Sequence, residues 1–344
     1  MTQVFLETLT SLGSSWHLVE RRFSTSIAEV GKFRPKKLLA SVSLLARLFL
    51  AQRKYKPIAS ILFITNRPAS FIVDWAITEI LRLFKQPLVN YIHTNGFSDL
   101  AARNLVFKFL VKRALGYAEQ TVCLSVTLQE DVAWAVRGAL CTIPNTPYRI
   151  PIKQPNMRSP RPSFLFLSNL IPEKGVGIFV DAAILVAATV PSAKFIIAGD
   201  SPDPATVDLL RSKIQSSGYE EQISILGKAD EETKWRLLDE AHALVFPSTY
   251  PFEAQPLTIV EAMSRGVPVI AFDTGGIRDL IADGLTGYLI KSTESTSLVA
   301  PMQRIAVESE VTKKLGNRAA ERFEESFSRS AYERSWAQVL NADY

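Results

Sequence analysis

The chain has 344 residues, of which 47% are hydrophobic and 21% are charged. This composition is too apolar for a disordered or collagen-like protein, and the length suits two domains of about 150–170 residues each. The two cysteines, Cys123 and Cys141, cannot crosslink a chain of this size, which favours a reducing compartment. No apolar run reaches about 18 residues and no signal-peptide pattern opens the chain, so we expect neither a membrane-spanning helix nor a signal peptide.

The net charge of +5 is distributed unevenly along the chain. Residues 1–150 hold 19 Lys and Arg against 9 Asp and Glu, whereas residues 151–344 hold 20 against 25. Such a split suggests two structural units that meet different partners.

The N-terminal half alternates between helical and strand patterns. It opens on a predicted helix at Val4–Leu12 and a predicted strand at His17–Phe23, an unusual start for a doubly wound domain, which normally begins on a strand. The next predicted elements are a helix at 36–56, a strand at 61–65, a helix at Phe71–Phe84, and strands at 88–92, 120–125 and 139–144.

The C-terminal half consists of short, near-continuous apolar runs separated by helical patterns. Runs of this length, bounded by Gly, Pro or Ser, are typical of strands that are buried on both faces. The predicted strands are 164–168, 194–199, 223–227, 243–248, 267–272 and 286–290, and the helices between them include Val176–Ala188, Ala205–Ser216, Glu231–Ala241 and Pro256–Arg265. This alternation predicts right-handed crossovers and a doubly wound parallel sheet.

Prolines divide the chain into two domains. Residues 150–162 contain Pro151, Pro155, Pro160 and Pro162, a density that stops helices and strands alike. We therefore expect a linker near residue 155, with one Rossmann-like α/β domain over residues 1–155 and a second over residues 156–326. In such sheets ligands bind beyond the C-terminal ends of the strands, so a cleft between the two domains is the expected site.

The segment SNLIPEKGVG (168–177) follows a predicted strand and opens a helix. The free N–H groups of a helix start and the charge of Lys174 together suit a diphosphate, although an ordinary loop with a solvated lysine has the same pattern. The overlapping GVGIFV lacks the third glycine of a dinucleotide fingerprint, because Val180 stands there, so NAD is not expected.

The segment FPSTYPFEAQPLTIVEAMSRGVPVIA (246–271) places two carboxylates around another helix start. Glu253 lies in the loop after a strand and is free to face the cleft, whereas Glu261 lies about two turns into the helix, from where it could accept hydrogen bonds from a ribose diol. The amides near Leu257 and Thr258 are free donors at the helix start.

A third segment, DTGGIRDLIADGLTG (273–287), places two glycines between a strand and a helix. The backbone of Gly275 and Gly276 could approach a ligand closely, and the alternative is a plain tight turn.

In this order, NLIPEKG, IIAGD, EAQPLTIVE, GVPVIA and DTGG resemble the nucleotide-sugar-binding domain of retaining GT-B glycosyltransferases of the group 1 type, specifically glycosyltransferase family 4. The resemblance is specific over about 125 residues, from Ser168 to Ile290, and CTIPNTP (141–147) extends it towards the N-terminus. The segment FSRSAYERSWAQVL (327–340) resembles the closing helix of these enzymes, so residues 327–344 are expected to pack back on the N-terminal domain.

The resemblance implies a role for each matching residue. Lys174 would hold the donor diphosphate, Glu253 would sit at the donor sugar and stabilise an oxocarbenium-like transition state, and Glu261 would bind the ribose hydroxyls. His93, at the end of an N-domain strand, would face the sugar or the acceptor, although a purely structural histidine fits its position equally well. The remaining donor-binding positions are Asn169, Gln255, Leu257, Thr258, Gly275 and Gly276.

The resemblance also implies catalysis without a metal or a cofactor. No D-x-D pair, the mark of a metal-held diphosphate in the other glycosyltransferase fold, occurs in the sequence, and no His/Cys cluster has metal-ligand spacing. Two substitutions depart from the family pattern: Asn169 replaces an arginine, and Pro256, which has no N–H to donate, replaces a glycine. The first strand of the fold and its Gly-Gly loop are expected to be missing before Val4.

The N-terminal half also carries a basic face. From Val30 to Val73 there is no acidic residue, and the nine basic ones are Lys32, Arg34, Lys36, Lys37, Arg47, Arg53, Lys54, Lys56 and Arg67. Basic amphipathic helices, here 36–56 and a second one around Arg103–Arg113, suit an anionic membrane surface. Nucleic acid is disfavoured because no recognition motif is present, and charges that are merely solvated are the remaining alternative.

These patterns together predict a cytoplasmic protein that is peripheral on the inner face of the cell membrane. The predicted activity is retaining transfer of a sugar from a UDP- or GDP-sugar to a lipid-linked or polysaccharide acceptor, in cell-envelope or exopolysaccharide synthesis. The alternative is a truncated, catalytically weak GT-B protein that binds a nucleotide sugar or a partner without turnover.

Overall fold

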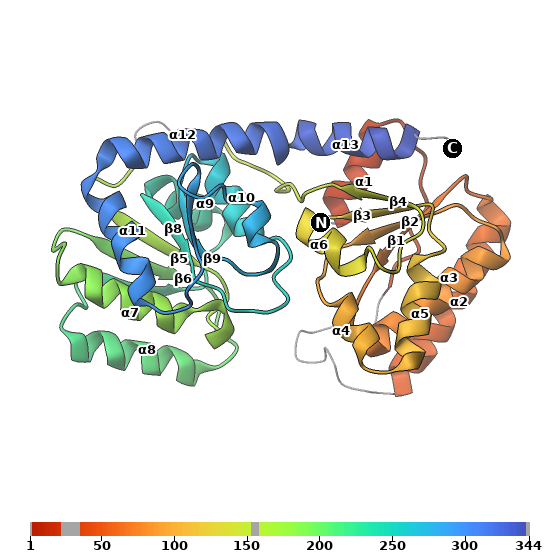
Figure 1. Cartoon of the computed structure of the whole chain (residues 1–344), viewed down its shortest axis with the longest axis horizontal. Helices are drawn as coiled ribbons and strands as arrows, with labels where there is room; N and C mark the ends of the chain where they lie inside the picture. The colour runs from red at the N-terminus through yellow and green to blue at the C-terminus, as the bar shows by residue number, and fades with distance from the viewer. Residues whose placement is uncertain (1, 22–34, 153–157, 342–344) are drawn as a thin grey trace. The chain divides into compact units, whose positions relative to one another are not determined.

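The structure is a computed structural model that describes residues 2–21, 35–152 and 158–341. It separates into two compact units, one formed by Met1–Ile143 with Glu333–Tyr344 and the other by Pro144–Tyr332 (Figure 1). The boundary between the units therefore precedes the proline-rich stretch from which a linker was predicted, and residues 153–157 of that stretch lie outside the described ranges.

The N-terminal unit contains a parallel sheet in the order β1-β2-β3-β4. Its strands are β1 (Ser60–Ile64), β2 (Leu88–Ile92), β3 (Gln120–Cys123) and β4 (Ala139–Thr142). All four were predicted from the sequence, because each is a short apolar run that ends at a turn. The parallel register, for example Ile64 beside Ile92 and Ile92 beside Cys123, places the C-terminal ends of β1, β2 and β3 at one edge of the sheet.

Helices connect these strands and cover the sheet. The described helices of this unit are α1 (Thr2–Ser11), α2 (Pro35–Tyr55), α3 (Pro68–Leu83), α4 (Phe97–Ala102), α5 (Leu105–Leu115) and α6 (Val126–Val132), together with α13 (Arg329–Asn341) from Glu333 onward. Helix α2 packs against α3 through Leu44 and Leu48, which are buried beside Ile77 and Leu81.

The strand predicted at His17–Phe23 is wrong over its described part. Residues 14–21 have no regular secondary structure, and residues 22 and 23 lie outside the described ranges. The segment is held by side chains rather than by a neighbouring strand: Val19 packs against the α2–α3 core, and Arg47 donates a hydrogen bond to the carbonyl of Glu20 (2.9 Å).

A cluster of aromatic side chains packs α1 and α13 against the sheet of the N-terminal unit. The ring of Trp336, which is fully buried, lies 4.7 Å from the ring of Phe5 on α1 and 4.9 Å from that of Tyr91 on β2. Phe5 also contacts Phe63 on β1 at 5.5 Å. The end of α13 therefore belongs to the core of this unit.

Replacing Trp336 with alanine is expected to destabilise the N-terminal unit by about 3–5 kcal/mol, the usual cost of emptying a large aromatic site in a core. Urea denaturation followed by circular dichroism measures this loss. The matched control is Trp16→Ala, because Trp16 is 45% exposed and its removal should cost only about 0.5 kcal/mol. Equal losses for the two variants would contradict a core role for Trp336.

The C-terminal unit contains a six-stranded parallel sheet in the order β10-β9-β8-β5-β6-β7. Its strands are β5 (Ser163–Leu167), β6 (Lys194–Ala198), β7 (Ile223–Gly227), β8 (Ala243–Phe246), β9 (Val269–Phe272) and β10 (Gly287–Ile290). The doubly wound parallel sheet predicted from strand–helix alternation is confirmed.

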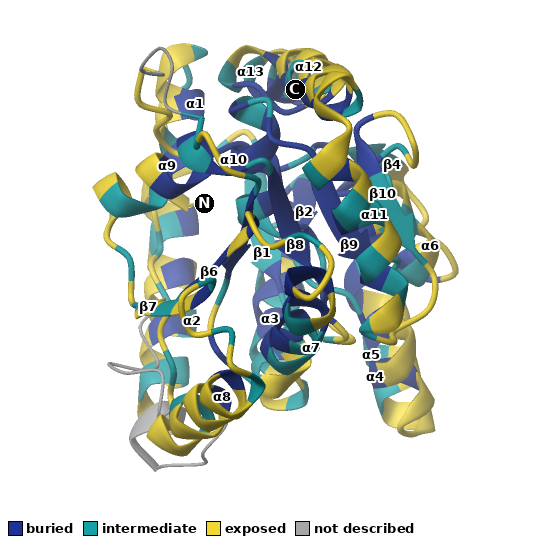
Figure 2. Ribbon diagram, turned by 90° about the vertical axis from the view of Figure 1, so that its left-hand side faces the viewer, coloured by how far each residue is buried: buried dark blue, intermediate teal, exposed yellow. Residues whose placement is uncertain are grey.

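The alternating side chains of β5 explain why helices cover both faces of this sheet (Figure 2). Phe164 and Phe166 pack into one core with α7 (Val176–Ala187), α8 (Pro204–Ser217) and α11 (Thr296–Val307), whereas Leu165 and Leu167 pack into the other. The second core is completed by α9 (Glu231–Glu240), α10 (Leu257–Ser264) and α12 (Ser309–Ser326). A strand buried on both faces must be apolar throughout, as its sequence SFLFL nearly is.

The strand order reverses between β5 and β8. From β5 the chain continues to β6 and β7 on one side, and from β8 it continues to β9 and β10 on the other. The loops that leave β5 and β8 therefore diverge at a topological switch point, where ligands of open α/β sheets bind. Of the predicted donor-side residues, Lys174 follows β5 and Glu253 follows β8.

Candidate functional site

The loops after β5 and β8 are bonded to each other through their backbones. The residues Pro172–Lys174 form a short 3-10 helix, η2, after β5. The amide of Thr249, which follows β8, donates to the carbonyl of Glu173 (2.9 Å), and the hydroxyl of Thr249 donates to the same oxygen (3.3 Å). These contacts fix the end of η2 beside the loop that carries Glu253.

Gly175 makes this close approach possible. Its φ of +79° lies in the left-handed region, and a Cβ at this position would overlap the carbonyl oxygen of Pro247. Only glycine combines this backbone angle with this contact at low cost. The sequence analysis singled out Lys174 but missed the packing role of the glycine that follows it.

Lys174 and Glu253 form an ion pair at the switch point. Both side chains are largely removed from solvent, with exposed fractions of 18% for Lys174 and 5% for Glu253. The hydroxyl of Ser248 donates a second hydrogen bond to Glu253 Oε1 (3.2 Å), and Lys174 Nζ lies 4.7 Å from the centre of the Tyr250 ring. The structure thus brings together the residues predicted for the diphosphate and for the donor sugar, and it adds Ser248 and Tyr250.

The electrostatics of this pair suit an anionic ligand. Burial lowers the pKa of Lys174, because desolvation disfavours the ammonium form, while the adjacent carboxylate of Glu253 favours it. A diphosphate that approaches Nζ would stabilise the ammonium form of Lys174, as Glu253 does. Such a ligand and Glu253 would therefore compete for one cation.

The two glycines after β9 hold the backbone of Glu253. The amide of Gly276 donates to the carbonyl oxygen of Glu253 (3.1 Å), and a Cβ on Gly275, whose φ is +52°, would overlap that same oxygen. The close backbone approach predicted for this pair is therefore made to Glu253, and the Gly276 amide is already used by the protein. Direct contact of either glycine with a donor stays a prediction.

Gln255 contacts the protein rather than facing outward. Its Oε1 accepts a hydrogen bond from the backbone amide of Asn145 (2.5 Å), and both residues are buried. Asn145 belongs to the CTIPNTP segment, so this bond joins that segment to the loop between β8 and α10. Gln255 shapes the loop that carries Glu253, and its predicted contact with a donor stays a prediction.

Helix α10 presents its N-terminus at the same edge of the sheet. It begins at Leu257 after Pro256, and no side chain caps it. The first amides of a helix have no partner within the helix, so those of Leu257 and Thr258 are donors positioned by the fold, with the positive end of the helix dipole behind them. Contact of these two amides with a phosphate or a sugar stays a prediction.

Glu261 lies on the second turn of α10 and pairs with a lysine that the sequence analysis missed. Lys234 Nζ on α9 lies 2.8 Å from Glu261 Oε1, and the two side chains are 18% and 11% exposed. Burial raises the pKa of Glu261, and Lys234 acts against this by stabilising the carboxylate. Lys234 is also desolvated, but its bonds to Glu261 and Glu231 raise its pKa. Lys234 therefore favours the charged form of Glu261 and orients its carboxylate.

Replacing Lys234 with methionine is expected to move the acid limb of nucleotide binding to higher pH. Without the lysine, the already raised pKa of Glu261 rises further, so the carboxylate that we predict to accept hydrogen bonds from the ribose hydroxyls is lost earlier as the pH falls. Calorimetric titration of UDP between pH 5 and pH 8 measures this shift. In the control Arg236→Met, which removes an exposed cation paired with Glu240 on the same helix, the profile should stay that of the wild type.

Asn169 lies in the loop between β5 and η2. Its side chain is exposed, and its carbonyl accepts a hydrogen bond from the amide of Ile171 (2.9 Å). Asn169 thus follows the same strand as Lys174, and its contact with a donor stays a prediction.

His93 follows β2 in the N-terminal unit, at the C-terminal edge of its sheet. Its ring stacks on Phe63 at 5.2 Å with an interplanar angle of 9°, and it lies 4.0 Å from the ring of Tyr91. Burial is the main cause that lowers its pKa to about 4, so the ring is neutral near pH 7. Nε2 is buried with no hydrogen-bond partner among the described residues. A neutral imidazole can bind a hydroxyl, but it does not supply a proton as an acid.

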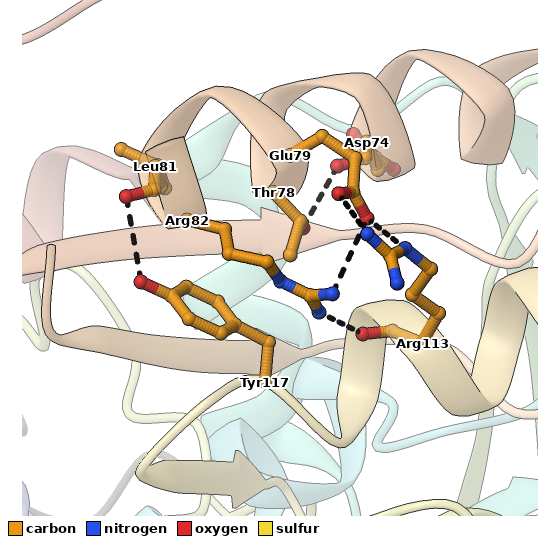
Figure 3. A network of polar contacts seen from close by, with 7 residues as sticks. All are labelled: Asp74, Thr78, Glu79, Leu81, Arg82, Arg113 and Tyr117. Atoms are coloured by element: carbon orange, nitrogen blue, oxygen red, sulfur yellow. Dashed lines mark hydrogen bonds and ion pairs between the residues drawn. The ribbon is translucent and has the colours of Figure 1, made fainter. Parts of the chain in front are cut away.

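The basic residues predicted on the acceptor side lie on α2. Arg47, Arg53 and Lys54 are exposed, while the side chains of Lys36 and Lys37 lie outside the described residues. On α5, Arg113 is not a free cation, because it binds both carboxylate oxygens of Glu79 on α3 at 2.7 Å (Figure 3). Arg82 donates to the carbonyl of Arg113 (2.7 Å), which completes the contact between α3 and α5.

The sequence analysis expected neither a metal site nor a membrane-spanning helix. Within residues 2–21, 35–152 and 158–341, no three His, Cys, Asp or Glu side chains are grouped as a metal site. No helix in this part of the chain combines the length and the apolar character needed to cross a bilayer.

Two parallel-sheet α/β units are the architecture of the GT-B class of glycosyltransferase fold, and the C-terminal unit carries a cation, a carboxylate and an uncapped helix at its switch point. Residues 150–322 match the family described as glycosyl transferases group 1, half of the chain, so the chain belongs to that family. The resemblance to group 1 enzymes that the motifs indicated is therefore confirmed.

Known proteins similar to the chain agree with this assignment. An alpha-D-kanosaminyltransferase of Streptomyces kanamyceticus is 27% identical over 160 residues, which is 46% of this chain and 40% of the relative. A poly(ribitol-phosphate) alpha-N-acetylglucosaminyltransferase of Staphylococcus aureus is 25% identical over 177 residues, 51% of this chain and 34% of the relative. The chain thus spans less than half the length of these relatives.

A solved structure extends the similarity over both units. Anabaena Alr3699/HepE, in complex with UDP and glucose, matches with a TM-score of 0.70 and 21% identity, covering 91% of this chain and 84% of that one. At this identity the comparison shows the fold alone, and it confirms the GT-B architecture.

Proposed function

We propose that the chain is a retaining glycosyltransferase that moves a sugar from a UDP- or GDP-sugar to a glycan or lipid-linked acceptor. The observation that carries the proposal is the Lys174–Glu253 pair, set between the carboxyl ends of β5 and β8 and beside the free amides of α10. A cation and oriented N–H groups in a partly desolvated site bind a diphosphate, and a carboxylate next to them suits a developing positive charge.

The chain's own residues account for each part of the reaction. Lys174 and the amides of Leu257 and Thr258 hold the diphosphate and stabilise the negative charge that grows on it as the glycosidic bond breaks. Glu253 faces the sugar carbon and stabilises its oxocarbenium-like charge. Glu261 accepts hydrogen bonds from the ribose hydroxyls. Because the leaving group is a nucleoside diphosphate, no acid is needed to protonate it, and we propose that transfer is independent of metals and cofactors.

Relatives support a carbohydrate polymer as the acceptor. One acts on poly(ribitol-phosphate), and another is named a colanic acid biosynthesis glycosyltransferase. The solved complex of Alr3699/HepE with UDP and glucose supports a uridine nucleotide as the donor. On this basis we place the chain in the synthesis of a cell-envelope or extracellular polysaccharide.

The experiment is a transfer assay with UDP- and GDP-sugars on membrane extracts, followed by NMR of the product. Release of the nucleoside diphosphate, with the anomeric configuration of the donor kept in the product, is the expected result. Inversion of the anomeric centre would contradict the retaining mechanism, and a lack of turnover with every donor would contradict the enzyme proposal for this chain.

A binding protein without turnover is the second candidate, because two positions that bind the donor in the family hold residues less able to bind phosphate. Asn169 stands where a second phosphate-binding cation is expected, and Pro256 stands where an additional amide donor is expected. Tight binding of a nucleotide sugar, with no release of its diphosphate over many hours, would support this candidate against the enzyme.

Membrane association is proposed on the exposed face of α5. Leu105 and Phe109 are 82% and 60% exposed, and Lys108 and Lys112 lie on the same stripe of the helix at spacings of three and four residues. Helix α2 adds the exposed Leu39 and Leu50, which its packing against α3 leaves uncovered. Apolar groups interleaved with exposed ammonium groups are typical of a helix that lies in an anionic membrane interface, so we place the protein peripherally on the cytoplasmic membrane face.

Replacing Phe109 with glutamate is expected to abolish flotation with anionic vesicles at low salt, because it removes an apolar contact and repels anionic lipid. Each lysine near such a surface contributes about 1 kcal/mol to membrane binding, and the added negative charge should offset a similar amount of that binding free energy. Leu209→Glu is the control, since Leu209 is 70% exposed on α8 of the other unit. Flotation that survives in the Phe109 variant, or fails equally in both, would contradict this surface.

A further inference from the structure

A cavity of the C-terminal unit lies at the edge of the sheet opposite Lys174 and Glu253. It has a volume of about 440 Å³, and its ten lining residues include Arg158, His242, Arg265, Gly266 and Lys313. Arg158, His242 and Gly266 precede β5, β8 and β9, whereas the donor-side residues follow the same three strands. Strands of this length separate the two edges by about 15 Å. The cavity is therefore distinct from the proposed donor site.

The wall of this cavity is cationic. Arg158, Arg265 and Lys313 line it, and none of the ten lining residues is acidic. The carboxylate of Asp239 lies behind the wall, where its Oδ1 is 3.4 Å from Arg265 Nε. Asp239 pairs with the buried Arg265, so the charges of Arg158 and Lys313 remain at the wall without a carboxylate among the lining residues.

The two arginines are fixed in place by the protein. Arg158 donates to the backbone carbonyls of Ala241 and Gly266, and the guanidinium of Arg265 lies 4.6 Å from the centre of the Trp235 ring. Arg265 is only 3% exposed, so its conformation is set by packing rather than by solvent. The fixed guanidinium of Arg158, which is half-buried, loses little entropy on binding, and its planar form suits the oxygens of a phosphate.

Neutral donors complete the wall. The amide of Ser163 donates to Nδ1 of His242 (3.2 Å), so the neutral ring carries its hydrogen on Nε2. Burial lowers the pKa of His242 to about 4, which keeps the ring neutral near pH 7. Ser309 and Asn317 add a hydroxyl and an amide from α12. Such groups bind the hydroxyls of a polyol, and the volume exceeds that of a bare phosphate ion.

From these observations we infer that this cavity binds the phosphate ester of a small polyhydroxylated molecule, such as a sugar phosphate, at a site separate from the donor site. The phosphate lies against Arg158 and Lys313, with the buried charge of Arg265 behind them, and the polyol faces Ser309 and Asn317. The cavity also contacts Ser264 and Arg265 at the C-terminal end of α10, whose N-terminal end carries Leu257 and Thr258. A ligand bound in this cavity therefore contacts the helix that presents the amides of Leu257 and Thr258.

The test is calorimetric titration of the full chain with glucose 6-phosphate and with inorganic phosphate. We expect both probes to bind, with glucose 6-phosphate binding more tightly because it also reaches the hydroxyl and amide groups. Lys313→Ala should weaken both probes about tenfold, the effect of one lost charge-assisted contact. Lys313 is exposed, so the variant is expected to fold as the wild type does.

Two controls separate this site from the donor site. Lys314→Ala removes the next lysine on the same helix, which is exposed but does not line the cavity, and should leave both affinities unchanged. Lys174→Ala should weaken UDP but not glucose 6-phosphate. Absence of binding by either probe, or binding that Lys174→Ala removes and Lys313→Ala preserves, would overturn the inference. Because UDP is titrated separately, failure of the donor site remains distinguishable from failure of this one.

Discussion

Replacing Glu253 with glutamine is expected to reduce sugar transfer by about 100- to 1,000-fold while leaving UDP affinity equal or higher. Removal of one preorganised electrostatic group from a transition state has an effect of this size. Glu253 pairs with Lys174 in the structure, so its neutral replacement releases the ammonium for the diphosphate. Initial rates of transfer and calorimetric titration of UDP measure the two effects.

Opposite changes in rate and affinity are what identify Glu253 as a group that acts on the sugar. The control is Glu173→Gln, which removes an exposed carboxylate from the loop beside Lys174 without touching the pair. Its transfer rate should stay within about threefold of the wild type, since surface substitutions have small effects. Full activity of the Glu253 variant, or a parallel loss of UDP affinity, would contradict the role assigned to Glu253.

Replacing Lys174 with alanine is expected to weaken UDP binding by about 10- to 100-fold, the effect of losing charge-assisted hydrogen bonds to a diphosphate. It should also lower the free energy of unfolding by about 1–3 kcal/mol, because Glu253 is 5% exposed and loses its partner. Calorimetry measures the first effect and urea denaturation the second.

The double variant Lys174→Ala with Glu253→Gln separates binding from stability. The neutral amide no longer needs a counter-charge, so part of the lost stability should return, whereas UDP affinity should stay low. Stability that falls further in the double variant would show that Lys174 and Glu253 are not coupled as the structure indicates.

Much of the fold could be predicted because its strands are buried on both faces. Runs such as FLFLS and LVNYI have no helical or alternating period to compete with the strand pattern, and the structure has β5 and β2 within one residue of the expected positions. The predicted strand at His17–Phe23 failed for the opposite reason. Its described residues are fixed by Arg47 and by contacts of Val19 that are distant in sequence, and no local pattern records such contacts.

The residues of the candidate site could be predicted where each lies in a loop that directly follows a buried strand. Lys174 and Glu253 each follow a buried strand, and the order of the strands brings them together. Gln255, Gly275 and Gly276 have the right position, but the structure shows them bonded to or packed on Asn145 and Glu253. Lys234 could not be found from the pattern, because it reaches Glu261 from a different helix.

The central claim is that Lys174 and the start of α10 bind a diphosphate, and it is tested most directly by calorimetric titration of the wild type and of Lys174→Ala with UDP, GDP and the corresponding nucleosides. The account predicts that one of the two diphosphates binds the wild type at least about tenfold more tightly than its nucleoside, and that Lys174→Ala removes most of this difference. Equal affinity for the diphosphate and the nucleoside, or a full difference retained without Lys174, would contradict it.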